Sequence, residues 1–285
     1  LERGEPGESH VVPTDVGSSE ALLDQLVAAV DAVRGPDARA VGIGVPSVVE
    51  FATGRVRYSV NIPLADLPLR ELLTDRIGLP VYVDNDASCA ALSEAYIGEK
   101  LVASELVMYT VGTGVGGGVV LGGRLYRGHT GAAPEMGHQI IGMDLSDAVP
   151  DARDKFPQVG SLESLAAGRV LDRLAKEAGF ESGKAAVAAA QDGDAEGARL
   201  VRIIGERLGI GIANAINVFD PAEVVIGGGV SAAGELLLGP AREVAARFTL
   251  HGVGTETTIR LARRGPEAGV VGAGLLAVQE LEREE

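Results

Sequence analysis

The sequence is poor in cysteine and in long apolar runs, and each shortage excludes a class of protein. Cys89 is the only cysteine among 285 residues, which excludes an internal disulfide and a cysteine-rich zinc site and fits a reducing compartment. No apolar run reaches the roughly 18 residues of a membrane helix, and the opening LERGEPGESH lacks the hydrophobic stretch of a signal peptide. We therefore expect a cytoplasmic protein that neither spans a membrane nor is secreted.

Basic residues are also in the minority. The chain has 25 Lys and Arg against 40 Asp and Glu, and its formal net charge is -15. A surface of this charge repels polyanions, so nucleic acid and anionic membranes are poor partners for this chain. Small molecules are the better candidates.

Apolar residues, in contrast, are plentiful. They make up 46% of a chain that is long enough to bury one large core or two ordinary ones. Residues 38–45 and 79–83 are apolar runs typical of buried parallel strands, and stretches with helical spacing lie beside them. Strands that alternate with helices predict an α/β fold. Further elements are expected as follows: a strand at 9–14, a helix capped by Ser18 or Ser19, a loop at 46–56 and a helix beginning near Pro240.

From Glu105 the pattern changes to three strand-like runs joined by glycines, with a Gly-Gly hairpin turn at 122–123. This change predicts two lobes. We expect a small α/β lobe at 1–104, completed by a C-terminal helix at 269–285, and a larger α/β lobe at 105–268.

The stretch VGTGVGGGVV at 111–120 contains the spacing G-x-G-x-x-G, which by itself is typical of dinucleotide-binding enzymes. That interpretation requires the glycines to leave a strand and open a helix, whereas β-branched residues and a hairpin signal follow them here. The glycines are therefore expected to join two strands. Such a turn either cradles phosphate, with backbone N–H groups and the Thr113 hydroxyl as donors, or is a tight hairpin without a ligand.

A second glycine-rich turn, at 227–229, follows an apolar strand-like run. Ligands of α/β sheets gather beyond the carboxyl ends of strands. Two such turns in one lobe therefore predict a nucleotide held between them, and simple reversal of the chain is the alternative.

Asp84, Asn85 and Asp86 follow a buried strand and lead into a helix. Capping that helix is one explanation, because Asp and Asn are favoured N-cap residues. One side chain is enough for a cap, and the others are left free to face a cleft. A carboxylate there can take the proton of a substrate hydroxyl during phosphoryl transfer.

Glu135 and His138 have the spacing Glu-x-x-His, and Glu163 lies in GSLES. The spacing suits metal ligands, but a second such unit and nearby cysteines are missing, so we expect no dedicated metal site. Glu163 on its own would also favour a helix N-terminus. The sharper interpretation is that these three side chains accept hydrogen bonds from a polyhydroxylated ligand.

Taken in order, these pieces resemble the ROK family of sugar kinases and sugar-responsive repressors. The resemblance covers nearly the whole chain and rests on an ordered set of segments: GIGVPSVVEFATGRV, NIPLADLPLRELL, GLPVYVDNDASCAALSE, VGTGVGGGVVLGGRLYRGHTGAAPEMGH, GSLESLAAGRVL, NVFDPAEVVIGGGVSAAGELL and GVVGAGLLA. It implies the two-lobed actin-like ATPase fold, which is ribonuclease H-like, with a central cleft.

The resemblance also implies roles for the residues named above. Asp86 matches the family's general base, and Asn85 matches a sugar-binding residue. The positions that hold sugar hydroxyls are matched by Glu135, His138 and Glu163. The second phosphate loop and the nucleotide-binding wall are matched by VGTGVGGG, with Thr113 and Gly114, and by IGGGVS, with Gly228 and Gly229. ATP and Mg²⁺ are the implied cofactors, and a homodimer is the implied assembly.

The sequence departs from the family pattern in three places. The cysteine-rich zinc segment is replaced by QIIGMDLSDAVPDARDKFPQVG, so we expect no structural zinc. The usual Pro-Gly is Pro46-Ser47 here, which bears on sugar specificity more than on chemistry. The family's D-x-G-G-T phosphate loop does not precede LERGEPGESHVVPT, so the first lobe is expected to be truncated at its N-terminus.

The expected function is ATP-dependent phosphorylation of a hexose, most simply of glucose to glucose 6-phosphate, with Asp86 as the base. A sugar-sensing ROK-type transcriptional regulator and a catalytically inactive sugar-binding remnant are the alternatives. Family repressors carry an N-terminal helix-turn-helix that these residues lack. The presence of Asp86, both glycine turns and all three hydroxyl-binding positions favours the kinase.

Overall fold

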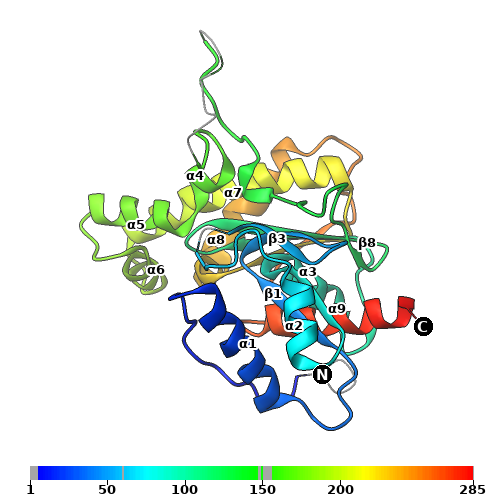
Figure 1. Ribbon diagram of the computed structural model, residues 1–285. Helices are drawn as coiled ribbons and strands as arrows, with labels where there is room; N and C mark the ends of the chain where they lie inside the picture. Colours follow the sequence, from blue (N-terminus) through cyan, green and yellow to red (C-terminus); the bar gives the residue numbers. More distant parts are fainter. Residues whose placement is uncertain (1–5, 60, 147–148, 150–155, 285) are drawn as a thin grey trace. The chain divides into compact units, whose positions relative to one another are not determined.

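The computed structural model describes residues 6–59, 61–146, 149 and 156–284 (Figure 1). Within these ranges the chain forms two compact units. The first lies within Leu1–Ser104, Gly118–Pro134 and Pro266–Glu285, and the second lies within Glu105–Gly117 and Glu135–Gly265. The segment Gly118–Pro134, which the sequence placed in the larger lobe, thus has its contacts in the first unit. No helix in the described part of the chain is long and apolar enough to cross a membrane.

The first unit is built on a parallel strand pair, β1 (Val41–Val45) and β4 (Val81–Asn85). Val45 is paired with Asn85, so both strands end at the same edge. Its helices in the described ranges are α1 (Ser19–Val33), α2 (Leu69–Ile77), α3 (Asp86–Ala95) and α9 (Ala268–Glu284). Short antiparallel pairs complete it: β2 (Ser47–Glu50) with β3 (Arg55–Ser59), and β5 (Tyr96–Ile97) with β6 (Lys100–Leu101).

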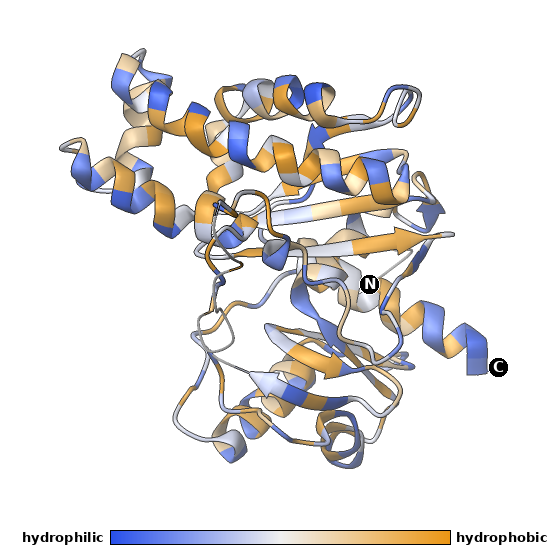
Figure 2. Cartoon of the chain, turned by 90° about the horizontal axis from the view of Figure 1, so that it is seen from above, coloured by the Kyte–Doolittle hydropathy of each residue, from blue (hydrophilic) through white to orange (hydrophobic). Residues whose placement is uncertain are grey.

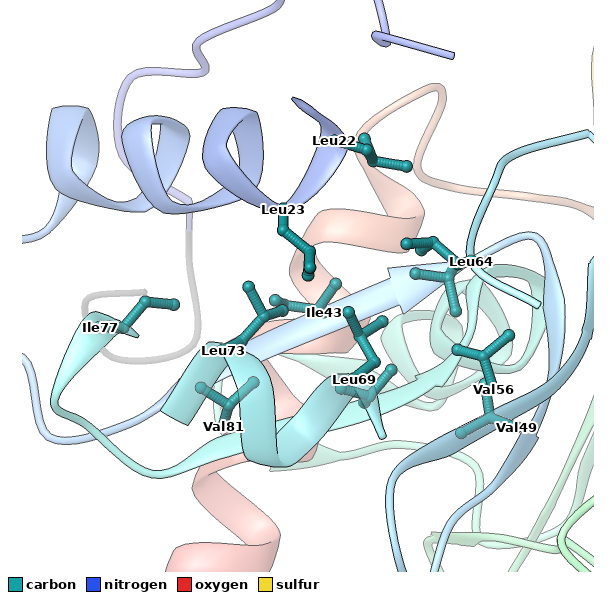
Figure 3. Close-up of a cluster of buried hydrophobic side chains, with 12 residues drawn as sticks. Leu22, Leu23, Ile43, Val49, Val56, Leu64, Leu69, Leu73, Ile77 and Val81 are labelled. Atoms are coloured by element: carbon teal, nitrogen blue, oxygen red, sulfur yellow. The ribbon is translucent and has the colours of Figure 1, made fainter. Parts of the chain in front are cut away.

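An apolar core joins α1, α2 and the strands of the first unit, as Figure 3 shows. On α2, Leu69, Leu73 and Ile77 recur every four residues and therefore share one buried face. On α1, Leu22 and Leu23 reach the same cluster. The helix begins where expected, because the Ser18 hydroxyl accepts a hydrogen bond from the N–H of Ala21.

The last helix, α9, packs closely against α3 and β1. A Cβ on Gly272 would lie 1.6 Å from the carbonyl oxygen of Cys89, and one on Gly42 would lie 1.7 Å from that of Ala273. Glycine at these two places is what lets the backbones approach. Figure 2 shows that the C-terminal end of α9, unlike its start, is hydrophilic.

Two expectations for the first unit were wrong. Residues 46–56 were expected as a loop, but β2 and β3 form a hairpin there, because Val49 and Val56 turn inward with exposures of 2% and 0%. Residues 9–14 were expected as a strand and form none. Proline has no N–H to donate to a strand partner, and the carbonyl oxygen of Pro13 is instead bonded by the side chain of Gln25.

The second unit contains most of a sheet with the strand order β11-β10-β7-β8-β9. Three strands run parallel: β7 (Leu106–Val111), β10 (Glu223–Gly227) and β11 (Thr258–Leu261). The strand β8 (Val115–Leu121) continues into the first unit, where it pairs antiparallel with β9 (Arg124–Leu125). The expected hairpin turn between them is confirmed by φ angles of 58° and 75° at Gly122 and Gly123.

Helices make up the rest of the second unit: α4 (Leu162–Ala166), α5 (Gly168–Glu177), α6 (Gly183–Gln191), α7 (Ala195–Phe219) and α8 (Glu235–Phe248). Two short 3-10 helices, η1 (Met136–His138) and η2 (Gly229–Ala233), accompany them. The expectation that α8 begins near Pro240 was wrong, since the helix begins at Glu235 and Pro240 lies inside it. The N–H that proline lacks would have bonded the carbonyl of Leu236, an exposed residue.

Candidate functional site

The strand β4 ends at the polar triplet from which α3 starts. Asn85 is the N-cap of α3, because its side-chain oxygen accepts a 3.0 Å hydrogen bond from the N–H of Ser88. Its amide nitrogen lies 3.4 Å from the carbonyl oxygen of Ser47 on β2. The sequence left open which member of the triplet caps the helix, and the structure assigns that role to Asn85.

Asp86 is the first residue of α3 and is not needed as its cap. One carboxylate oxygen accepts a 2.8 Å hydrogen bond from the N–H of Ala87, and the residue keeps an exposed surface. Even so, surrounding protein atoms displace enough water to raise the pKa of Asp86, while the backbone hydrogen bond lowers it. The result is an aspartate that keeps exposed surface and whose carboxylate has a raised proton affinity.

Asp84 is buried and forms an ion pair that the sequence did not predict. Its Oδ2 accepts a 2.7 Å hydrogen bond from Arg127, and its Oδ1 accepts one of 2.8 Å from the N–H of Asn85. Burial raises the pKa of Asp84, and the guanidinium group lowers it. The pair joins residues 43 positions apart, so no local pattern could have indicated Arg127.

The glycine turn, residues 112–114, joins β7 to β8 in the second unit. A 2.9 Å hydrogen bond from the N–H of Gly112 to the carbonyl of Gly114 closes it, and the N–H of Gly168, at the start of α5, bonds Gly112. Strands lie on both sides of the turn, so the dinucleotide interpretation is excluded, as expected. Thr113 is exposed at the tip of the turn.

Glu163, on the short helix α4, contacts this turn. Its Oε2 accepts a 2.8 Å hydrogen bond from the N–H of Val115, and its Oε1 pairs with Arg169 at 2.7 Å. A Cβ on Gly114 would lie 2.5 Å from the same Oε2. The carboxylate is therefore fixed against the glycine turn from two sides.

Glu135 precedes η1, and His138 is its last residue. His138 Nε2 lies 3.9 Å from the Glu135 carboxylate, and its Nδ1 lies 3.2 Å from the side-chain oxygen of Gln158. Desolvation raises the pKa of Glu135, His138 lowers it, and the nearby charge of Glu163 raises it. The N–H of Leu162, next to Glu163, bonds the carbonyl oxygen of Gln139, next to His138, at 2.7 Å, so the three residues lie in one neighbourhood of the second unit.

In the described ranges, no group of three or more His, Cys, Asp or Glu side chains is placed to hold a metal ion. Residues 147–148 and 150–155, part of the segment in place of the family's cysteines, lie outside those ranges.

The second glycine-rich turn follows β10. Gly228 has a φ of 86°, and a Cβ there would lie 2.5 Å from the carbonyl oxygen of Val111, so this residue is pressed against the end of β7. Gly229 begins η2 and has no atom within 4 Å of an added Cβ. The two glycines thus differ: one is required by the packing and the other borders open space. The structure groups the expected site residues as Asn85 and Asp86 in the first unit and the rest in the second.

The chain is similar to sugar kinases and to sugar-responsive regulators. It is 35% identical over 258 residues to a glucokinase from Halalkalibacterium halodurans, covering 84% of this chain and 76% of that one. It is 34% identical over 220 residues to a xylose repressor from Caldicellulosiruptor bescii, covering 72% of this chain and 53% of that one.

Among solved structures, the chain matches the crystal structure of a ROK family glucokinase from Streptomyces griseus in complex with glucose and AMPPNP. The TM-score is 0.80 with 34% identity, and the match covers 98% of this chain and 94% of that one. The fold is therefore that of the ROK glucokinases, the actin-like ATPase fold. The ROK family model matches residues 3–280, and the chain belongs to the ROK family.

Proposed function

We propose that this protein phosphorylates a hexose, most simply glucose, with ATP as the phosphoryl donor. The proposal rests on Asp86, whose carboxylate lies at the start of α3 and is not needed as its cap, because Asn85 caps this helix. The relatives of this chain named above include a glucokinase and a glucokinase complex with glucose and AMPPNP. The activity of those proteins is thus the first candidate for this chain.

In this mechanism Asp86 accepts the proton of the sugar hydroxyl as that oxygen attacks the γ-phosphate. The carboxylate suits the task because the residue has exposed surface, and the raised pKa makes it a stronger base than an ordinary aspartate. Asn85 offers the sugar the second N–H of its amide, because the first faces the carbonyl of Ser47 and the amide oxygen caps α3. Glu135, His138 and Glu163 accept or share hydrogen bonds with the remaining hydroxyls.

The glycine turn and Gly228–Gly229 are the parts of the chain that suit a triphosphate. Thr113 is exposed at the first turn, and an added Cβ on Gly229 would meet nothing within 4 Å, so phosphate oxygens can approach the backbone there. Mg²⁺ bound to the triphosphate supplies charge neutralisation at the transferred group. We further propose that the protein works as a homodimer in the cytoplasm, which analytical ultracentrifugation and cell fractionation would test.

The direct test is ADP release from Mg-ATP in the presence of glucose, mannose, fructose and N-acetylmannosamine. ADP release that depends on one sugar supports the kinase and identifies its substrate. The Asp86→Asn variant should lose on the order of 10²- to 10⁴-fold in turnover while it binds sugar nearly normally. Full activity in that variant refutes the role of Asp86.

The similarity to a xylose repressor favours one second candidate, a sugar sensor without chemistry. A sensor binds sugar in calorimetry but releases no ADP with any of the four sugars. Binding without ADP release would favour the sensor over the kinase.

A further inference from the structure

The buried ion pair of Asp84 and Arg127 contacts the junction of β4 and α3, which carries Asn85 and Asp86. The Asp84 side chain is 3% exposed and that of Arg127 is 15% exposed. One oxygen of Asp84 bonds the guanidinium group, and the other bonds the N–H of Asn85. Each oxygen thus has a protein partner, and this carboxylate holds backbone rather than ligand.

Arg127 also contacts two other elements of the first unit. Its guanidinium lies 3.5 Å from the centroid of the Phe51 ring, which follows β2, and 3.7 Å from Glu280 on α9. Ser47, the first residue of β2, receives the side-chain amide of Asn85. A single arginine therefore contacts the strand end that carries Asn85, the hairpin that meets Asn85 and the last helix.

The loop that begins at Arg127 is itself held in place. The N–H of Ala133 bonds the carbonyl oxygen of Arg127 at 3.1 Å. Gly131 has a φ of 86°, and a Cβ there would lie 2.8 Å from the backbone nitrogen of Phe51. The backbone of Arg127 is therefore fixed, which keeps its guanidinium on Asp84.

We propose, resting on the kinase function proposed above, that Asp84 and Arg127 are positioning residues that fix the backbone of Asn85 and so orient the Asn85 amide and the Asp86 carboxylate toward the sugar. Neither residue touches the substrate. A displacement of about 1 Å at reacting groups can cost on the order of 100-fold in rate. Loss of the pair should therefore lower kcat far more than it changes the affinity of the folded protein for ATP.

The test compares variants of the full chain by kcat, by the KM values for hexose and ATP, and by the fraction of molecules that bind sugar in calorimetry. Arg127→Met keeps an unbranched side chain and loses the guanidinium group with its charge, and its kcat per sugar-binding molecule should fall roughly 10- to 100-fold with the KM for ATP unchanged. Asp84→Asn keeps an oxygen for the N–H of Asn85 and should lose less. The double variant should be more active than Arg127→Met, because no buried charge is left alone.

Arg127→Lys covers the case in which Arg127→Met does not fold. It retains the positive charge but not the planar group that bonds Asp84 while it stacks on Phe51, so it should fold and still lose several-fold in kcat. The matched control is Arg55→Met, which breaks the exposed ion pair with Asp66 in the same unit and should leave kcat unchanged.

The outcomes separate the two proposals. Wild-type kcat per sugar-binding molecule in folded Arg127→Met and Arg127→Lys overturns the positioning role and leaves the kinase intact. Equal losses in the Arg55→Met control also overturn it, since the effect would not be specific to this pair. A wild-type protein that releases no ADP with any sugar refutes the kinase, and the positioning role with it.

Discussion

The Glu163 carboxylate accepts a 2.8 Å hydrogen bond from the backbone N–H of Val115, the residue that follows the glycine turn. A side chain proposed to hold sugar is thus bonded to a turn proposed to lie near phosphate. The two proposed functions of the second unit therefore depend on the same backbone segment.

Gly114→Ala should weaken sugar binding. The added Cβ would lie 2.5 Å from Glu163 Oε2 and push the carboxylate off the N–H of Val115. We expect a loss of about tenfold in sugar affinity, or roughly 1.4 kcal/mol, by calorimetry without nucleotide. Gly112→Ala is the control, because its Cβ meets nothing within 4 Å. Equal affinities for the two variants would contradict the prediction.

The ionisation of Asp86 should set the acidic limb of the pH profile of kcat/KM. The base must be ionised to accept a proton, so kcat/KM should fall as the pH drops through the pKa of Asp86. Because desolvation raises that pKa, the limb should lie at higher pH than for an ordinary aspartate. Initial rates over a pH series on wild type and Asp86→Asn would test this. If the residual rate of the variant falls over the same pH range, the acidic limb belongs to another group.

The raised pKa values of Asp84 and Glu135 also predict how stability depends on pH. A carboxyl with a raised pKa in the folded state holds its proton more tightly there than in the unfolded chain. Such a group therefore contributes most to the free energy of unfolding at low pH. This contribution is lost as the pH rises from the pKa of the group in the unfolded chain to its pKa in the folded protein. In Glu135→Gln, denaturant unfolding at several pH values should show a smaller loss over that window than in wild type. An unchanged pH dependence would refute the contribution of Glu135.

Two helix glycines should respond to alanine to different extents. Gly239, inside α8, has no atom within 4 Å of an added Cβ apart from its chain neighbours. The gain in helix propensity is offset there by Pro240, whose ring crowds the Cβ of a preceding helical residue, so Gly239→Ala should change stability by less than about 1 kcal/mol. Gly205, inside α7, would place its Cβ 2.4 Å from the carbonyl oxygen of Leu237, so Gly205→Ala should destabilise by about 1–3 kcal/mol. Urea unfolding of both variants measures this, and a Gly205→Ala variant as stable as wild type would refute the close packing of α7 on α8.

Cys89 should be unreactive in the native protein. Its side chain is fully buried on α3 beside α9, and burial raises the pKa of the thiol. Iodoacetamide should therefore label the denatured chain completely and the native chain only at the rate of unfolding. Rapid native labelling, followed by mass spectrometry, would show that the contact between α3 and α9 opens readily.

The sequence predicted elements well where local signals were enough. The helix at Ser18 has its cap within three residues, and the Gly122–Gly123 turn has its φ angles set by glycine itself. The hairpin over 47–59 was missed because Val49 and Val56 are buried against a core that helices distant in the sequence supply, and the local pattern does not show that core. The strand expected at 9–14 failed for the complementary reason, since exposed Val11 has no apolar surface to cover.

The candidate site divides in the same way. Motifs in the sequence indicated Asp86, Glu135 and Glu163, because each belongs to a short ordered pattern. Their geometric roles remain predictions. The partners that hold such groups, Arg127 above all, come from positions far away in the chain, and only the folded backbone brings them together.

The first unit is assembled from segments that lie far apart in the sequence, and α9 packs against the helix that begins at Asp86. During synthesis on the ribosome, α3 is made long before the helix that covers Cys89 has emerged. The residues proposed to bear the catalytic base thus wait for α9 before their surroundings are complete. A nascent chain that has not yet reached α9 lacks that cover.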